Sequence, residues 1–359
     1  MNAEIMLKDE DDDVCQPLLY PPDHPVSPAA PATIKPGYGQ EQSKARNRWI
    51  TIEPIVFLSF IGNGTFSTIR TEYLQHRIGM DTYNYTFTSN ESDTTTCITN
   101  SSDPDYMLQQ KIQQDASSWI LYISICNYLP LLFTSILFGT WSDTAGRKIA
   151  LVVSLIGMVL QTTMYLIVIS LRLPIPLLLI GDFVAGITGN VPLLLVACLA
   201  YIADITTREQ RTFRVVIVET TILVSIGGAQ LFMGYFIHAK GFVAPFFLIL
   251  ACLGAATAYA LIPGVLYETI MPPEELSSQP KRSRFIQVLH GVIDLFTYNV
   301  NARRWRLIMI CVIFLCLNLV LYGYLSVFTL YVIGEPFCWS TVLVGIWQAI
   351  SLSLAAIGK

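Results

Sequence analysis

The feature that most constrains this chain is a series of eight long segments without a Lys, Arg, Asp or Glu. Most of them exceed the roughly 20 residues that an α-helix needs to span the hydrocarbon of a bilayer. Since a spanning segment must satisfy its own backbone hydrogen bonds, the segments predict helices. We therefore expect an all-α integral membrane protein with eight transmembrane helices, over Pro54–Ile69, Ala116–Trp141, Ile149–Leu171, Phe183–Ala203, Thr220–Ile237, Phe242–Tyr267, Leu307–Ile333 and Cys338–Gly358.

The composition agrees with a chain that lies mostly in lipid. Of the 359 residues, 53% are hydrophobic and 13% are charged, and the mean hydropathy is +0.52. The net charge of −4 and the placement of the bases in loops argue against a nucleic-acid partner. The sequence holds no His/Cys cluster with metal-ligand spacing, no phosphate loop and no nucleophile elbow, so we expect no cofactor, no metal and no enzyme activity.

The distribution of basic residues predicts the orientation. Of the 22 Lys and Arg residues, 16 lie in the N-terminal tail and in alternate loops, whereas the opposite loops hold Arg70, Arg77, Lys111, Arg172 and Lys240. By the positive-inside rule the N-terminus is therefore cytoplasmic. Three glycosylation sequons, at Asn84, Asn90 and Asn100, lie in the first loop on the opposite side, outside the cell or in a lumen.

Two of the eight cysteines fall on that outer side, Cys97 in the first loop and Cys338 between the last two helices. They form either one disulfide, in an oxidising compartment, or two free thiols. We expect the bridge, because free thiols are uncommon in such compartments.

These assignments divide the chain into four parts. Residues 1–48 are acidic and rich in proline, and predict a disordered cytoplasmic tail. Residues 49–268 predict a bundle of six helices with a glycosylated outer loop over 70–115. Residues 269–306 predict a cytoplasmic linker, and residues 307–359 predict the first two helices of a second, incomplete bundle.

Between the second and third predicted helices the chain carries an acid, a glycine and two bases in the stretch GTWSDTAGRKIAL. Gly146 permits a sharp turn, and Arg147 and Lys148 hold it at the headgroups. Asp143 can accept hydrogen bonds from Arg147 or from a neighbouring helix end. Such a charge cluster breaks when helices separate, so we expect a gate formed by Gly139, Asp143, Gly146, Arg147 and Lys148.

The spacing G-x-x-x-D-x-x-G-R-K, between helices 2 and 3, resembles the corresponding loop of the major facilitator superfamily of secondary transporters. Further stretches are similar to the proton-coupled folate transporter family, solute carrier family 46: IEPIVFLSF, TEYLQHRIG, AYIADITTREQRTFRVVIVE, GYFIHAKGF and TLYVIGEPFCWSTVLVGIW. The resemblance begins near Glu53. It implies a protein of twelve helices with both termini cytoplasmic, of which this chain would hold eight and end inside the eighth.

Four residues gain a role through this resemblance. Glu219 matches the glutamate of helix 5 that couples protons in the folate-transporting member. Asp143 matches the family's aspartate in the loop between helices 2 and 3. Cys97 and Cys338 match its outer disulfide, which agrees with the bridge expected from topology.

Three residues depart from the folate-transporting member. Leu321, Asn190 and Asp182 stand where that member has a histidine, an aspartate and an arginine. The departures argue against folate as the substrate. They place the chain nearer to the family's other members, which resemble lysosomal or plasma-membrane carriers of anionic and conjugated organic compounds.

Small and polar residues recur at helical spacing along helix 4, at Asp182, Gly186, Gly189, Asn190, Ala197, Ala200 and Asp204. Such a stripe lines a polar pathway or lets helices pack closely. Asp182 favours the pathway, because an acid in lipid costs roughly 2.5 kcal/mol or more and faces a cavity or a partner. In helix 5, Glu219 shares a face with Gln230, and it either relays a proton or pairs with a base at the inner rim.

The sequence thus predicts a secondary active transporter that moves a small organic anion with protons by alternating access, with Asp182, Asn190 and Gln230 in the pathway. The alternative is a membrane protein that does not transport, either a truncated regulatory isoform or a receptor-like relative. The expected partners are the anion, protons and the bilayer of a plasma or lysosomal membrane. No oligomeric state is predicted.

Overall fold

A computed structural model of the chain describes residues 51–84 and 104–268, together with scattered helical positions between 305 and 354. The described part is helical, and no strand occurs within it. Its elements in chain order are α2 (Glu53–Tyr83), α3 (Pro104–Ala145), α4 (Arg147–Ser170), the 3-10 turn η1 (Ile175–Leu177), α5 (Leu178–Ile187), α6 (Asn190–Ile205), α7 (Arg208–Lys240) and α8 (Val243–Leu261).

Within the described residues, five segments are long and apolar enough to cross a membrane: Gln110–Ser135, Arg147–Ser170, Ile175–Ile205, Glu209–Phe232 and Val243–Leu261. They correspond to predicted helices 2 to 6. Outward-facing side chains are apolar, as lipid requires; Leu129, Leu132 and Phe133 of α3 are 60–61% exposed. The all-α membrane class is confirmed. The count of eight stays a prediction, since helices 7 and 8 lie largely outside the described part.

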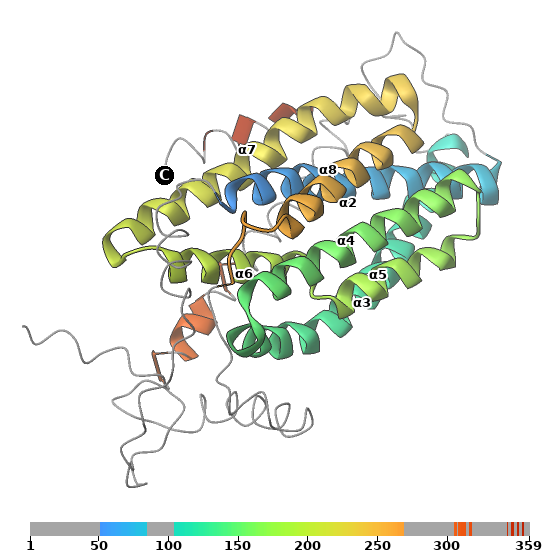
Figure 1. Cartoon of the computed structure of the whole chain (residues 1–359). Helices are drawn as coiled ribbons and strands as arrows, with labels where there is room; N and C mark the ends of the chain where they lie inside the picture. The colour runs from blue at the N-terminus through green and yellow to red at the C-terminus, as the bar shows by residue number, and fades with distance from the viewer. Residues whose placement is uncertain are drawn as a thin grey trace, which may run out of the picture.

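Figure 1 shows the described helices side by side in one bundle. α2 packs against α7 and α8, α4 packs against α5, α6 and α8, and α3 packs against α5. Glycines allow the close approach: a Cβ at Gly62 would lie 3.2 Å from Leu253 Cγ of α8, and one at Gly64 would lie 2.9 Å from Ile226 Cγ1 of α7. In lipid, close packing of this kind is what holds helices together.

At the start of the first helix, α2, the Glu53 side chain bonds back to the two residues before the helix. Glu53 Oε2 accepts hydrogen bonds from the backbone N–H groups of Thr51 at 2.8 Å and Ile52 at 3.0 Å. Pro54 fits this turn because a helix leaves its first N–H groups without partners in any case.

The same helix extends further than its charge-free run predicts. It continues through Arg70 and Arg77, which the count of basic residues assigned to the first outer loop, and it ends at Tyr83. Since α3 begins at Pro104, the segment 70–115 is helical at both ends. Arg70 is therefore a residue of the helical bundle and not of the outer loop to which the count of basic residues assigned it.

The segment predicted as helix 4 is not one helix but two, α5 and α6, with a break at Thr188 and Gly189. Gly189 has φ 86° and Asn190 has φ 41°. Pro192 supplies the physical reason, because its ring clashes with the carbonyl of Thr188 four positions earlier and it has no N–H to donate there. The polar face expected along this segment is interrupted, and Asp182 and Asn190 fall on different halves.

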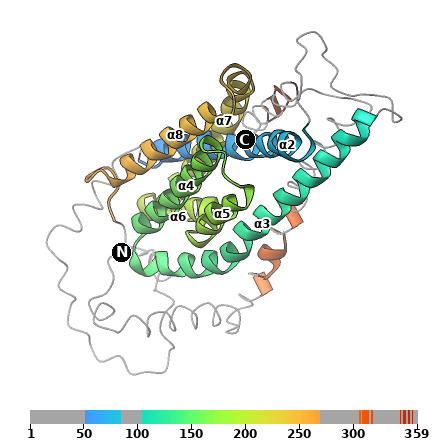
Figure 2. The ribbon, with the colours of Figure 1, turned by 90° about the vertical axis from the view of Figure 1, so that its right-hand side faces the viewer.

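Helix α3 is the longest described helix, with 42 residues, and contains Pro130. A proline inside a helix removes one backbone hydrogen bond and bends the helix. Figure 2 shows α3 curving along one side of the bundle, next to α5. At this contact a Cβ on Gly186 of α5 would lie 2.3 Å from the carbonyl oxygen of Asn127, so the two backbones touch.

Candidate functional site

Asp182 is the centre of a group of polar side chains inside the bundle. Its Oδ2 accepts a hydrogen bond from Tyr165 Oη at 2.6 Å, and its Oδ1 accepts one from Gln161 Nε2 at 2.8 Å. Arg70 Nη1 lies 3.5 Å from the same Oδ1. The Asp182 side chain is 0% exposed and that of Arg70 is 16% exposed. We call Arg70, Gln161, Tyr165 and Asp182 the polar cluster; it joins α2, α4 and α5.

Helix α3 contributes to the backbone around this cluster. Asn127 Nδ2 donates a hydrogen bond to the backbone oxygen of Asp182 at 3.0 Å. Cys126 Sγ lies 3.5 Å from the carbonyl oxygen of Leu179. The turn of α5 that carries Asp182 is thus held from both sides, by α3 and by α4.

Aromatic rings lie against the polar cluster. The Phe66 ring is 4.9 Å from that of Tyr165 and 5.7 Å from that of Phe246, and the Tyr165 and Phe246 rings are 5.8 Å apart, all between centroids. Arg70 Cζ lies 5.9 Å from the Phe66 centroid. The guanidinium therefore lies beside a surface of low dielectric constant, where its attraction for an anion is stronger than in water.

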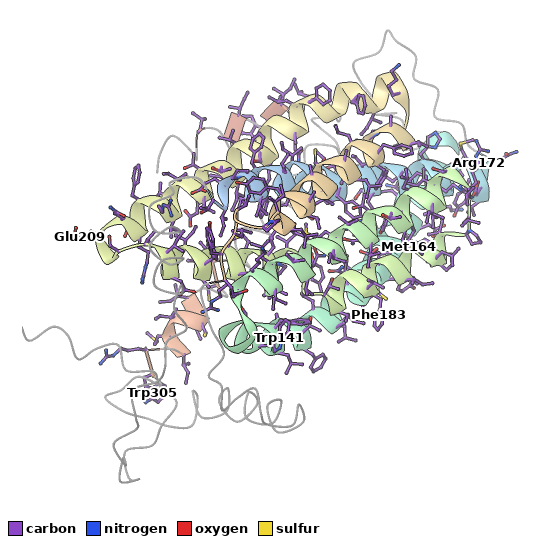
Figure 3. All side chains as sticks on the ribbon, in the orientation of Figure 1. Trp141, Met164, Arg172, Phe183, Glu209 and Trp305 are labelled. Atoms are coloured by element: carbon purple, nitrogen blue, oxygen red, sulfur yellow. The ribbon has the colours of Figure 1, made fainter. Side chains whose placement is uncertain are left out.

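The polar cluster lies toward one end of the bundle. Tyr165 is 18 residues past Arg147, the first residue of α4, which is about 27 Å along the helix. Met164 packs beside Gly181, the neighbour of Asp182. In Figure 3 the label on Met164 marks this level, with Arg172 at the nearer end of the bundle and Trp141 toward the other.

The sequence indicated Asp182 as a site residue but did not indicate its partners. Gln161 and Tyr165 stand four residues apart in an apolar segment, which places them on one face of α4. Arg70 directly follows the first charge-free run. The sequence thus marked each of these residues separately. That α2, α4 and α5 bring them together follows only from the packing of the helices.

The other predicted pathway residues lie elsewhere in the bundle. Asn190 begins α6, and its Oδ1 lies 2.8 Å from the backbone nitrogen of Val191. Gln230 Nε2 donates to the carbonyl oxygen of Gly64 at 3.3 Å and so joins α7 to α2. Glu219 is half-buried on α7, five residues past the buried Arg214. Four residues were predicted for the pathway or for proton coupling, and of these Asp182 belongs to the polar cluster, whereas Asn190, Gln230 and Glu219 do not.

A narrow gap lies between α2, α4 and α8, next to the polar cluster. It has no room for a water molecule, so the bundle is tightly packed at this level. Its lining includes two amide side chains among apolar ones: Asn63, Phe66, Met158, Gln161, Thr162, Ile249 and Leu253.

The predicted gate lies where α3 turns into α4. Gly146 separates the two helices and has φ 118°, a conformation that favours glycine. Arg147 Nε lies 3.3 Å from Asp204 Oδ2, near the end of α6, and Arg147 Nη1 lies 3.3 Å from Ser142 Oγ. An ion pair therefore ties this turn to the second half of helix 4. The side chain of Asp143 lies outside the described residues.

Lys148 ties the same turn to the short segment that follows α8. Its Nζ donates to the carbonyl oxygen of Leu266 at 3.2 Å, and its backbone N–H donates to Glu268 Oε1 at 3.5 Å. The Glu268 carboxylate fills the space at Gly146, where a Cβ would lie 2.3 to 2.5 Å from its atoms. At Gly139, by contrast, a Cβ would meet no atom within 4 Å. The sequence did not indicate Asp204 or Glu268 as partners of this turn.

Several predicted positions lie outside the described residues: Cys97, Cys338, Asn90, Asn100 and Leu321. Asn84 is the exposed residue that follows α2, and it has φ 52°. Across 51–84, 104–268 and the positions described beyond them, no group of three His, Cys, Asp or Glu side chains is placed to hold a metal ion.

Residues 52–359 match the Major Facilitator Superfamily, and the chain belongs to this superfamily. A curated relative, the proton-coupled folate transporter of Rattus norvegicus, is 30% identical over 301 residues, which cover 83% of this chain and 62% of the relative. The lysosomal proton-coupled steroid conjugate and bile acid symporter of Rattus norvegicus is 31% identical over 308 residues, which cover 83% and 65%.

These matches confirm the resemblance to solute carrier family 46 that the motifs predicted. The two identities are nearly equal, so they do not place the chain nearer to the non-folate members. The chain spans less than two thirds of the length of both relatives. The crystal structure of the human organic anion transporter MFSD10 shares the fold, with a TM-score of 0.56 at 14% identity, covering 85% of this chain and 71% of that one.

Proposed function

We propose that this protein is a secondary active transporter that moves small organic anions together with protons by alternating access. The observation that carries the proposal is the polar cluster, a fully buried aspartate beside a partly buried arginine in the membrane bundle of a major facilitator. Charged groups inside a membrane are costly and mark pathways for ions and polar solutes. Two relatives carry proton coupling in their names, one with folate and one with steroid conjugates and bile acids.

Within this cycle, Glu219 carries the coupled proton, and Asp182, Asn190 and Gln230 line the pathway. The position of Glu219 on α7 supports its part, because Glu219 is half-buried in the bundle and ionisable side chains inside membrane helices mark ion and proton pathways. The predicted match to the coupling glutamate of the family adds to this.

The turn at Gly146 acts as the gate of the cycle. The ion pair of Arg147 with Asp204 and the contacts of Lys148 with the end of the bundle support this role, because such contacts fix one arrangement of helices and must break for another. Gly139 and Asp143 complete the motif.

We also propose that the N-terminus and the Gly146 turn are cytoplasmic and that the protein lies in a plasma or lysosomal membrane. On the opposite side, glycans at Asn84, Asn90 and Asn100 and a bridge between Cys97 and Cys338 would protect the outer loops. The exposure of Asn84 at the end of α2 supports the first of these sites.

Reconstitution of the full-length protein into liposomes tests this function. With an acidic exterior and a neutral interior, labelled folate, estrone sulfate and cholate are each offered, with and without a protonophore. We expect at least one of them to accumulate above its external concentration, and the protonophore to abolish the accumulation. Uptake equal to that of protein-free liposomes for all three would contradict the proposal.

A further inference from the structure

We propose that Arg70 binds the acid group of the transported anion, and that Asp182 is the buried negative charge that competes with this anion for the guanidinium. The inference rests on the proposed function and deepens it, because it names the residue that recognises the charge and the chemistry of the ligand. The ligand is an organic molecule with a carboxylate, sulfate or sulfonate attached to an apolar ring system.

The first step is that Asp182 does not depend on Arg70 for its hydrogen bonds. Each carboxylate oxygen already accepts from a neutral donor, Tyr165 Oη at 2.6 Å and Gln161 Nε2 at 2.8 Å. The distance of 3.5 Å to Arg70 Nη1 is longer than the 2.7–2.9 Å of a well-formed charge-assisted hydrogen bond. Arg70 therefore attracts Asp182 through its charge and does not form a well-aligned hydrogen bond with it.

The second step is that Arg70 has unused donors. A guanidinium carries five N–H groups in a planar fork that matches a carboxylate or sulfate. Its neighbours among the described side chains are Asp182 and the Tyr165 hydroxyl, and its Nε is buried without a hydrogen-bond partner. Since Nε is buried in this arrangement, a second acceptor would reach Nε and the adjacent terminal nitrogen when the helices part, and it would then satisfy this donor and form a bidentate pair.

The third step concerns the rest of the ligand. Arg70 keeps 16% of its side chain exposed, so a ligand can reach it, whereas Asp182 is 0% exposed. Beside the guanidinium lie the rings of Phe66, Tyr165 and Phe246. These rings are 0–7% exposed in this arrangement, so an apolar body next to the acid group would pack on them once the helices part during the cycle, and a hydrophilic anion such as phosphate would gain nothing from them.

Opposite effects of the two charged residues distinguish this inference from a structural ion pair. If Arg70 binds the anion, removing its charge weakens binding, whereas Asp182→Asn removes a competing negative charge and leaves binding equal or stronger. If the pair only holds α2 to α5, each single change damages the protein alike, and the double change Arg70→Gln with Asp182→Asn restores it.

The experiment is ligand-induced thermal stabilisation of the purified full-length protein, with naphthalene-2-carboxylate, its neutral amide naphthalene-2-carboxamide, and estrone sulfate. We expect the wild type to be stabilised by the two anions and not by the amide. Arg70→Gln should raise the apparent Kd for both anions at least tenfold, Arg70→Lys should give an intermediate value because it keeps the charge and loses the fork, and Asp182→Asn should keep or lower the Kd.

Arg77→Gln is the matched control, because Arg77 lies two turns further along the same helix and pairs with Asp81 and with the carbonyl oxygen of Arg172. Its Kd should equal that of the wild type. Size-exclusion profiles show which variants fold. If Arg70→Gln does not fold, Arg70→Lys takes its place as the test of the guanidinium. Wild-type affinity in a folded Arg70 variant, equal losses in Arg70→Gln and Asp182→Asn, or no stabilisation of the wild type by either anion would overturn the inference. Because binding is measured without a gradient, a failure of transport alone contradicts only the proposed function.

Discussion

At the scale of single residues, the bundle shows how a charged side chain is kept inside a membrane protein. Asp182 is fully buried, yet both oxygens have donors and a guanidinium lies beside it. An unpaired carboxylate at the same depth would be neutralised or would exclude the fold. The neutral donors Tyr165 and Gln161 therefore stabilise this carboxylate together with the opposite charge of Arg70.

Tyr165→Phe tests this contribution. The change removes one hydroxyl and leaves the ring contacts with Phe66 and Phe246 in place. Because the hydrogen bond ends on an ionised group, we expect the free energy of unfolding to fall by about 1.5–3 kcal/mol. Titration with dodecyl sulfate in mixed micelles measures it. Tyr128→Phe on α3 is the control, since Tyr128 is 65% exposed, and an equal loss in both variants would contradict a special role for Tyr165.

Glu219→Gln belongs to the same scale and tests proton coupling. Glutamine imitates a permanently protonated glutamate of nearly the same volume, so exchange of substrate at equal pH on both sides should continue, while uptake driven by a pH gradient should be lost. Both are measured in the proteoliposomes described above. A variant that still concentrates substrate along the gradient would show that Glu219 does not carry the proton, and Asp182 would then be the next residue to test.

At the scale of elements, the break between α5 and α6 depends on a close contact with α4. Gly157 of α4 faces the break, and a Cβ there would lie 1.7 Å from Thr188 Oγ1. The absence of a side chain at Gly157 thus makes room for the Thr188 side chain at the break, and both helix halves of this segment pack against α4.

Gly157→Ala should therefore destabilise the bundle. Overpacking of a tight contact costs about 1–3 kcal/mol, and the Thr188 side chain must move to admit the methyl group. Gly254→Ala in α8 is the matched control, because its Cβ would meet no atom within 4 Å; alanine favours the helix there by up to about 1 kcal/mol. The same micelle titration compares the two, and an equal free energy of unfolding for both would disprove the tight contact.

The sequence predicted those helices that an uninterrupted run of uncharged residues is enough to define. Helices 2 to 6 follow from charge-free runs, and the structure has them at nearly the predicted places. The length of α2 did not follow, because Arg70 and Arg77 look like loop residues until Asp182 is known to face one of them. The break in helix 4 had a local signal in Gly189 and Pro192, but the apolar run hid it. Side-chain partners such as Asp204 and Glu268 come from elements far apart in the chain, so spacing within one segment does not reveal them.

At the scale of the whole molecule, the proposed transport cycle requires that contacts at one face of the bundle break in each turn of the cycle. Asp204→Asn removes the partner of Arg147 and leaves the polar cluster intact. We expect the maximal uptake rate to fall about tenfold, equivalent to about 1.4 kcal/mol in the barrier, with the KM for substrate little changed. Asp143→Asn should act in the same direction.

Asp81→Asn is the control for the gate, since Asp81 pairs with Arg77 at the far end of α2. Uptake kinetics over a range of substrate concentrations separate the two parameters. If Asp204→Asn raises KM and leaves the maximal rate unchanged, this residue belongs to the binding site and not to the gate. Unchanged kinetics would contradict the gate.

The opposite face holds the predicted bridge between Cys97 and Cys338. A membrane-impermeant maleimide added to intact cells should leave the protein unlabelled until a reductant opens the bridge, because the other cysteines are placed in the tail or in helices by the sequence. The readout is a mass shift on a gel. Labelling at both cysteines without reductant would rule out the bridge.

The seating of the Glu268 carboxylate against Gly146 has a mechanical consequence. This carboxylate lies in the segment that follows α8, and Lys148 donates to it through its backbone N–H and to the Leu266 carbonyl oxygen through Nζ. A pull on the chain beyond residue 268 would therefore act on the start of α4 as well as on α8. A displacement of whatever follows residue 268 would therefore act on the turn that carries the ion pair of Arg147 with Asp204.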